Sequence, residues 1–201
     1  MKALFITLAI TFYLTSNAIF AQEKNIETQS VEIENLISFI VENYKKKQEG
    51  DSGIYNLIFL IQVSNNGYSL EDEVILKQGF KLLSKRLTEE DTISIIGHSG
   101  LSGIALEKES IKSVKKILYT LNNFKSSIKE FHQDGITLAY AYANENFVEE
   151  AINKVIMVRM PNSQNIAETQ NTSAKPKKKK TSAIILTAIT LLPEIISVLK
   201  D

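Results

Sequence analysis

The sequence contains no cysteine, and only two of its 201 residues are histidine. The lack of cysteine excludes disulfide bonds, thiolate nucleophiles, thiolate metal sites and the acylated cysteine of a bacterial lipoprotein. A domain without disulfides has to be held by its own hydrophobic core. With 44% hydrophobic residues, this sequence can build one.

The sequence also lacks an excess of charge of either sign, because 23 basic residues balance 23 acidic ones. The balance is uneven along the chain. Residues 22–174 hold 16 basic and 21 acidic residues, a formal net charge of −5, whereas residues 175–201 hold six lysines against two acids. A nucleic-acid-binding domain is usually basic across a whole face. We therefore expect no nucleic-acid partner.

Residues 1–21 have the features of a cleavable secretory signal. One positive charge at Lys2 precedes an apolar stretch, and small residues stand at Ala18 and Ala21. The apolar stretch is shorter than the ~20 residues that a membrane-spanning helix needs. An uncleaved anchor is the alternative, and both interpretations predict export to the periplasm or cell envelope.

Hydrophobic periodicity predicts alternating helices and strands. The near-continuous apolar run at 54–63 indicates a central strand buried on both faces. The short loop between the strands at 92–98 and 103–106 predicts an antiparallel hairpin. A Ser127 to Glu130 capping box would begin the last helix, and residues 22–30 look polar and loose. The remaining predicted elements are helices at 31–44, 70–87 and 111–121 and a strand at 153–158.

This alternation predicts an α/β fold of Rossmann-like type, with a mostly parallel sheet, flanking helices and one antiparallel edge strand. We divide the chain by composition into a signal helix and four further parts. These are an N-terminal helix and linker at 22–53, a domain at 54–161, a polar, lysine-rich linker at 162–181 and an apolar tail at 182–201.

Three segments of the domain resemble a known family. They are the leucine-rich helix, acidic turn and strand of residues 82–96, the Gly-Ile-Thr-Leu-Ala-Tyr helix of residues 135–147, and the strand at 153–158. In this order and spacing they resemble the von Willebrand factor type A domain, mainly its exported bacterial members. The resemblance covers residues 54–161 and implies a protein-binding function.

The resemblance also implies where a metal-ion-dependent adhesion site would lie. The family uses Asp-x-Ser-x-Ser after the first strand, a threonine before the third helix and an aspartate after the fourth strand. Glu130, Ser126 and Ser127 compete for the threonine position, and the others fall on Gln62, Ser64, Asn66 and Met160. Only Ser64 is retained, and a divalent cation needs anionic oxygen ligands. We therefore expect a degenerate site with no metal and no cofactor.

A second departure from the family is at the carboxyl end of the domain. The family sheet has two more strands beyond the fourth, which this sequence replaces with a linker and the apolar tail. We therefore expect the strand at 153–158 to be an open sheet edge, which proteins usually cover.

The sequence offers no catalytic constellation. His98 and Ser99 are adjacent on a predicted strand, where neighbouring side chains point to opposite faces, so they should not act together. The surrounding residues lack the Gly-x-Ser-x-Gly spacing of a nucleophile elbow. The acidic residues 89–91 look like a solvated turn. We expect a protein that is not an enzyme.

The expected function is that of a protein-interaction module which binds another envelope or extracellular protein. Ligands of open α/β sheets dock at the carboxyl ends of the strands. The loops expected there are residues 64–67, 125–127 and 159–163. They supply the candidate partner-binding residues Ser64, Asn65, Asn66, Ser126, Ser127 and Arg159.

The carboxyl-terminal segment supports an alternative function. Lys177, Lys178, Lys179 and Lys180 precede the apolar residues 182–199. This segment could span a membrane, lie on an anionic membrane surface, or pair with the open sheet edge. In the alternative interpretation, the protein is a membrane-associated accessory subunit that docks through this tail.

Overall fold

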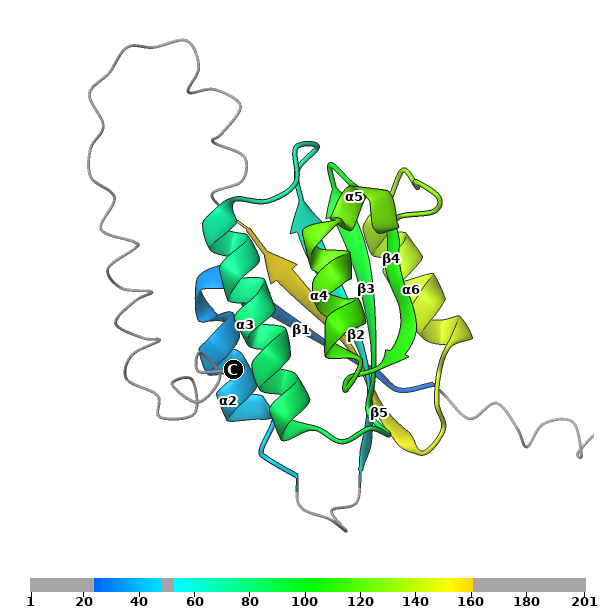
Figure 1. Cartoon of the computed structure of the whole chain (residues 1–201). Coiled ribbons are helices and arrows are strands. Elements are labelled where there is room, and N and C mark those ends of the chain that lie inside the picture. Colours follow the sequence, from blue (N-terminus) through cyan, green and yellow to red (C-terminus); the bar gives the residue numbers. More distant parts are fainter. Residues whose placement is uncertain (1–23, 48–52, 161–201) are drawn as a thin grey trace, which may run out of the picture.

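The computed structural model describes residues 24–47 and 53–160. They form an α/β fold around a five-stranded sheet of order β1-β5-β2-β3-β4, as Figure 1 shows. Four neighbouring strands are parallel, and the fifth pairs antiparallel with β3 at one edge. This arrangement confirms the predicted fold class and is consistent with a von Willebrand factor A-like fold. The strands are β1 Ile26–Glu32, β2 Ile54–Val63, β3 Thr92–Ser99, β4 Gly103–Ser110 and β5 Ala151–Arg159.

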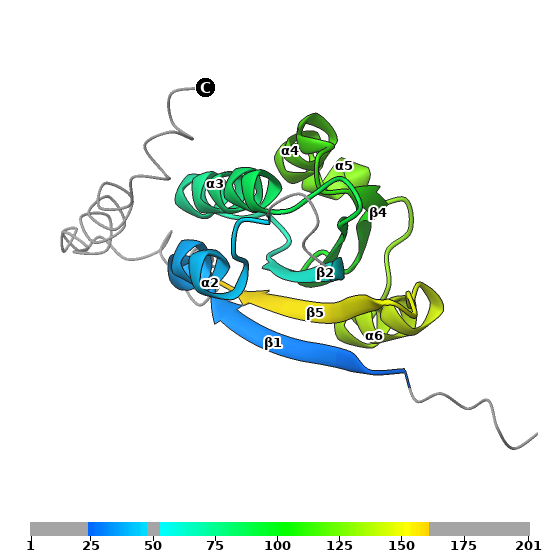
Figure 2. The ribbon, with the colours of Figure 1, turned by 90° about the horizontal axis from the view of Figure 1, so that it is seen from below.

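Helices cover the two faces of the sheet unequally (Figure 2). Three of them, α2 (Leu36–Asn43), α3 (Leu70–Arg86) and α4 (Val114–Asn122), bury their apolar residues in one core. On the opposite face, α6 (Gly135–Glu145) packs against a smaller core. Two short elements, the 3₁₀ turn η1 (Ile33–Asn35) and α5 (Phe124–Ser127), complete the described part of the chain.

The central strand β2 takes part in both cores, as its apolar run predicts. Leu57, Phe59 and Ile61 face the three-helix side, whereas Ile58 and Leu60 face α6. All five side chains are at most 1% exposed. A strand with apolar residues on both faces can be buried only in the middle of a covered sheet, which fixes its position between β5 and β3.

The start of the domain differs from the prediction. Residues 22–30 were expected to be loose and 31–44 helical, but residues 26–32 form strand β1 and α2 begins only at Leu36. The strand pairs with β5 in continuous parallel register, from Ile26 opposite Asn153 to Glu32 opposite Arg159. Hydrogen bonding to an exposed strand edge overrides the weak helical pattern of this segment.

This pairing also corrects the prediction of an open edge at residues 153–158. β1 covers that edge of β5, so the strand beside β5 comes from the N-terminal side of the domain. The suggested pairing of the tail with this edge required an unpaired strand, and the edge is already paired with β1. The tail, like the signal segment, lies outside the described residues.

The expected capping box at Ser127 is also wrong. The hydroxyl of Ser127 donates to the carbonyl of Asn123 at 2.9 Å, within α5. The following helix, α6, begins instead at Gly135, where the carboxylate of Asp134 accepts hydrogen bonds from the backbone N–H groups of Ile136 and Thr137. A capping aspartate satisfies the same open donors at a helix N-terminus. Among the described helices, none is both long enough and apolar enough to cross a membrane.

Candidate partner-binding site

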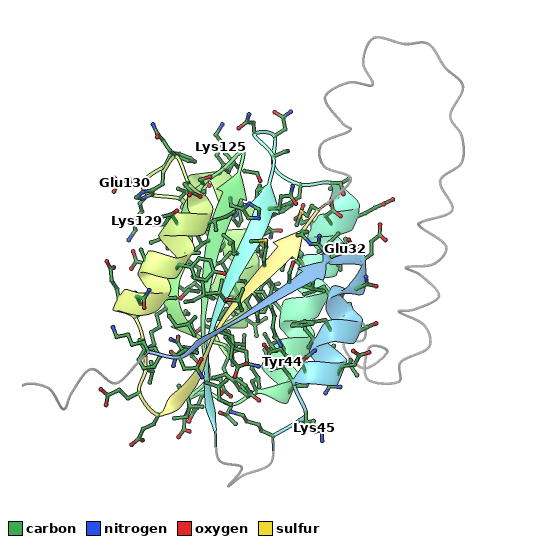
Figure 3. All side chains as sticks on the ribbon, turned by 180° about the vertical axis from the view of Figure 1, so that it is seen from behind. Glu32, Tyr44, Lys45, Lys125, Lys129 and Glu130 are labelled. Carbon is green, nitrogen blue, oxygen red and sulfur yellow. The ribbon has the colours of Figure 1, made fainter. Side chains whose placement is uncertain are left out.

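The carboxyl ends of the parallel strands and the loops that follow them form one end of the molecule. The β2–α3 turn, the β3–β4 hairpin and the segment around α5 meet there, at the top of Figure 1. From the opposite side, Figure 3 shows Lys125 at this end and Tyr44 and Lys45 at the other end. This is the position where ligands of open α/β sheets dock.

A tight turn directly after β2 exposes two asparagines. The hydroxyl of Ser64 donates to the carbonyl of Gly67 at 2.5 Å, and the N–H of Gly67 donates back to the Ser64 carbonyl at 3.0 Å. Gly67 has φ of +88°, a conformation that glycine adopts without steric cost. The turn places Asn65 and Asn66 at its tip, with both side chains exposed.

The β3–β4 hairpin packs directly on this turn. The N–H groups of Gly100 and Leu101 both donate to the carbonyl of Val63, at 2.7 and 3.2 Å. A Cβ on Gly100 would overlap the backbone nitrogen of Asn65, so only glycine permits this approach. The two loops therefore hold each other in one position.

The residues at the family's metal positions do not fit a divalent cation. The amide oxygen of Gln62 accepts a hydrogen bond from the N–H of Met160 at 2.9 Å, which ties the ends of β2 and β5 together. Met160 is 1% exposed and offers no oxygen in its side chain. The hydroxyl of Ser64 is engaged within its own turn. Within residues 24–47 and 53–160, no group of three acidic or histidine side chains is placed to hold a metal.

A pocket of about 890 Å³ lies beside the turn. Tyr68 and Phe124 form part of its wall, with their rings edge to face at 5.7 Å. The hydroxyl of Tyr68 donates to the carbonyl of Leu121, and burial raises the pKa of this phenol. The pocket wall is therefore a fixed structure. Its lining residues are Asn65, Asn66, Gly67, Tyr68, Glu73, Leu101, Leu121, Asn122, Asn123, Phe124, Lys125, Ser126 and Phe131.

Several polar groups of this lining have no partner among the described residues. The side-chain amides of Asn65, Asn66 and Asn122 and the ammonium group of Lys125 make no hydrogen bond or ion pair there. Phe131 is 54% exposed at the rim. A pocket that combines open hydrogen-bonding groups, one cation and an exposed aromatic ring has the composition of a recognition surface.

The structure brings together only part of the predicted set of partner-binding residues. Asn65, Asn66 and Ser126 line the pocket, although the hydroxyl of Ser126 donates to the carbonyl of Asn123 at 3.0 Å. Ser64 and Ser127 use their hydroxyl groups in local turns. The side chains of Lys177, Lys178, Lys179 and Lys180 lie outside the described residues.

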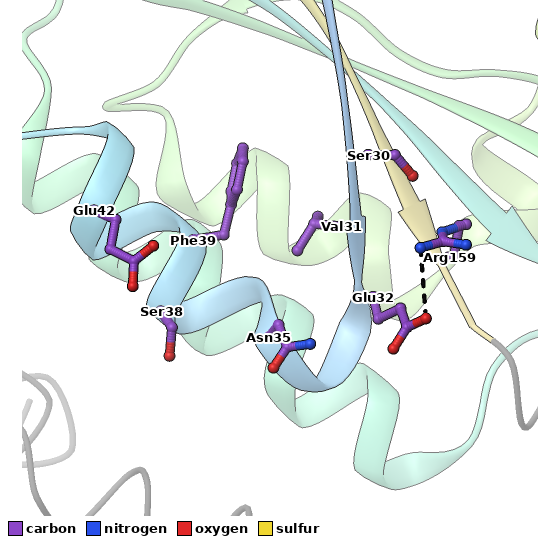
Figure 4. Close-up of a pocket in the computed structure, with 8 residues that line it drawn as sticks. All are labelled: Ser30, Val31, Glu32, Asn35, Ser38, Phe39, Glu42 and Arg159. Carbon is purple, nitrogen blue, oxygen red and sulfur yellow. Dashed lines mark hydrogen bonds and ion pairs between the residues drawn. The ribbon is translucent and has the colours of Figure 1, made fainter.

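Arg159 lies away from this pocket. Its guanidinium pairs with Glu32 of β1 at 3.4 Å, beside a second, smaller pocket between β1 and α2 (Figure 4). The sheet order explains the separation, because β5 lies on one side of β2, whereas β3 and β4 lie on the other.

Asn122 and Phe131 were not identified as site residues from the sequence, and Lys125 was placed only within one of the expected docking loops. Asn122 and Phe131 come from the end of α4 and from the loop before α6, which no motif connects to the β2–α3 turn. The available signal was positional, because a polar stretch rich in asparagine and serine follows the amphipathic helix at 111–121.

The structure corrects the interpretation of His98 and Ser99. Ser99 has φ of +79°, which turns its side chain out of the strand alternation. Its hydroxyl oxygen lies 3.1 Å from Nδ1 of His98, so the two side chains are in contact. Burial lowers the pKa of His98, and the carboxylate of Asp134 opposes this shift. His98 is 8% exposed, and among the described residues its Nε2 has no hydrogen-bond partner.

Comparison with known proteins gives a relative of limited coverage. Over 102 residues, 51% of its length, the chain is 31% identical to the uncharacterized protein YfbK of Escherichia coli (strain K12). The chain spans only 18% of that protein's length. No protein-family model matches the chain, and no solved structure matches it. The similarity indicates common ancestry over half the chain and says nothing about activity.

Proposed function

We propose that this chain is a non-catalytic, exported protein-interaction module. It has a von Willebrand factor A-like domain without a functional metal-ion-dependent adhesion site, and it binds another envelope or extracellular protein at the carboxyl ends of its strands. The signal-like residues 1–21 support export.

One observation carries this proposal. At the carboxyl end of the sheet, the side chains at the expected cation-binding positions already make hydrogen bonds within the protein. Several polar side chains around the neighbouring pocket make none among the described residues. Gln62 and Ser64 bond to backbone groups at 2.9 and 2.5 Å. Asn65, Asn66 and Lys125 have no partner among the described residues. Binding at this end therefore uses direct contacts rather than a bridging ion.

These open groups suit a protein surface. Asparagine amides both donate and accept hydrogen bonds, so they can pair with the backbone of a partner. Lys125 supplies a charge-assisted hydrogen bond to a carboxylate, and the exposed ring of Phe131 supplies apolar contact area. Leu101 and Leu121 give the pocket an apolar lining between these polar groups.

The test is partner capture from native envelope extracts by the full chain. We expect the same protein to be captured with and without chelator, and Lys125→Glu to reduce its capture at least tenfold. The matched control is Lys129→Glu, because Lys129 is also exposed but is paired with Glu107 at 3.2 Å outside the pocket. Capture by this control should be unchanged.

Two results would refute the proposal. Chelator-sensitive capture would mean that a cation bridges the two proteins after all. Capture that survives Lys125→Glu but is lost when residues 175–201 are deleted would assign binding to the tail, as in the alternative of a membrane-associated accessory subunit.

A further inference from the structure

The two edge strands of the sheet, β1 and β4, differ in how far they are protected against pairing with another strand. An edge strand presents unpaired backbone N–H and C=O groups, and proteins blunt such edges with charges, bulges, proline or a covering segment unless the edge is used. Comparing β4 with β1 therefore shows which edge is protected and which is left available.

Strand β4 carries several of these protective devices. Its register with β3 shifts between Ile93 and Ile95 and again before Ile96, the mark of a bulge. The phenol oxygen of Tyr142 accepts from the N–H of Lys108 at 2.9 Å, which occupies a backbone donor. The exposed residues Glu107 and Lys108 and the half-buried Glu109 add charge along the edge. Edge pairing at β4 is thus discouraged.

Strand β1 carries almost none of them. It pairs with β5 in unbroken register over all seven residues, and it contains no proline and no lysine. Its two glutamates turn back over the sheet, because Glu27 pairs with Lys154 at 2.8 Å and Glu32 pairs with Arg159 at 3.4 Å, both on β5. No described residue pairs with the outer side of β1. Among the described residues, this edge is regular and unpaired.

A groove runs beside this open edge. Residues of β1 and of the neighbouring helix α2 enclose about 390 Å³, and Figure 4 shows their side chains on both walls. Val31 and Phe39 provide apolar contact, and Asn35 and Ser38 provide hydrogen-bonding groups. The charges of Arg159 and Glu32 offset each other, so the exposed carboxylate of Glu42 leaves the groove with negative charge.

We propose that β1 is a docking strand, to which an extended segment of a partner protein carrying a lysine or arginine adds as a sixth strand. The outward backbone groups of β1 supply the hydrogen bonds, as in other cases of strand addition. The groove along α2 receives alternate side chains of the segment, and Glu42 selects a basic one. This surface is separate from the pocket around Lys125.

The experiment uses three synthetic peptides and the full chain. The first is acetyl-Thr-Val-Lys-Val-Lys-Val-Thr-amide, the second has glutamate in place of both lysines, and the third has proline in place of the central valine. We expect the lysine peptide to bind at least tenfold more tightly than either of the others in fluorescence polarisation. Proline removes a backbone donor, so the third peptide separates strand addition from simple charge attraction.

Two variants place the binding on this edge. Glu42→Lys should weaken binding of the lysine peptide at least tenfold, whereas Glu107→Lys on the β4 edge should leave it within twofold. Amide hydrogen exchange should slow in β1 and not in β4 when the peptide is added. Lys125→Glu should have no effect on peptide binding, so failure here is distinguishable from failure of the proposed function.

Other occupants of the edge would give other results, and each would overturn the proposal. If a second copy of the chain occupies the edge, the apparent mass in sedimentation should double and should depend on protein concentration. A chain that covers β1 with its own residues would bind none of the peptides. Equal binding of the proline peptide would show that only charge is recognised.

Discussion

The two ends of the sheet use their polar groups in opposite ways. At the amino ends of the strands, the buried carboxylate of Asp91 accepts from Lys47 at 2.6 Å, from the N–H of Tyr55 at 2.7 Å and from the N–H of Thr88 at 2.7 Å. At the carboxyl ends, Asn65 and Lys125 have no partner among the described residues. The carboxylate at the amino end is fully engaged within the fold, whereas these two side chains at the carboxyl end are not.

This difference gives opposite expectations for substitution. Removal of a buried polar group that bonds to several neighbours leaves those neighbours unsatisfied, so it lowers the free energy of unfolding strongly. An exposed group without partners costs the fold little and can be removed to measure recognition alone. The following predictions test this contrast, beginning with the largest effect.

Removal of the Asp91 carboxylate should be the most destabilising of these changes. Asp91→Ala leaves two backbone N–H groups without an acceptor and the ammonium of Lys47 with only the carbonyl of Gly53. Breaking a buried ion pair of this kind costs about 3–5 kcal/mol. Urea denaturation of the full chain measures the change. Glu90→Ala, at the exposed neighbouring position, should change stability by less than about 0.5 kcal/mol. Similar losses in both variants would show that the buried hydrogen bonds of Asp91 are not what stabilises this end of the sheet.

The same carboxylate should make the protein sensitive to acid. Burial alone raises the pKa of Asp91, but hydrogen bonds from Lys47, Thr88 and Tyr55 outweigh it, so the net pKa lies below the ordinary value of 3.8. A carboxyl with a depressed folded pKa stabilises the fold above its unfolded pKa, and this stability is lost as the pH falls through the folded pKa.

His98 acts in the same direction at higher pH, because its pKa also lies below its ordinary value of 6.5. Its protonation therefore begins to favour the unfolded chain as the pH falls below 6.5. Unfolding free energy measured against pH should decline in two steps, and Asp91→Asn should reduce the lower one, because the pKa values of Glu109 and Asp134 are also lowered. A curve for Asp91→Asn that matches the wild-type curve below pH 4 would contradict this assignment.

At the carboxyl end, the contact between the two loops should contribute more to stability than the exposed polar side chains do. Gly100→Ala places a methyl group against the backbone of Asn65, and overpacking of this kind costs about 1–3 kcal/mol. Because the turn has to move, partner capture should fall as well. For stability alone, Gly67→Asn is the control, since position 67 faces open space and asparagine tolerates the left-handed conformation at φ of +88°.

The smallest effect on stability is expected at the exposed asparagines. Replacement of both Asn65 and Asn66 by alanine should change the unfolding free energy by less than about 0.5 kcal/mol and still reduce partner capture at least fivefold. Thermal unfolding and envelope capture on the same preparation measure the two quantities. A large loss of stability with unchanged capture would mean that this end serves the fold.

The sequence predicted the central part of the sheet better than its margin. Strand β2 was recognised because ten apolar-rich residues in a row suit a strand buried on both faces. Strand β1 was missed because it is half exposed and because its partner strand comes more than 100 residues later. Pairing over such a distance leaves no local pattern.

The polar residues show the same limit. Asp91 stands among other acids and looks solvated in the sequence, yet it is 0% exposed because Lys47 and Tyr55 reach it from distant elements. Asn65 and Asn66 were identified because they directly follow the central strand. Phe131 was not identified, since only the folded chain brings its loop to the same pocket.

The pairing of β1 with β5 has a consequence for how this protein folds during synthesis. The first and last described strands lie side by side, and the ion pair between Glu32 and Arg159 joins positions 127 residues apart. Long-range strand pairing is slow because the intervening chain has to be closed first. During synthesis from the N-terminus, β1 emerges early and stays without its neighbour until β5 follows. A chain truncated before residue 151 would therefore keep β1 without its partner strand. Such an unpaired strand edge promotes aggregation and binding to chaperones.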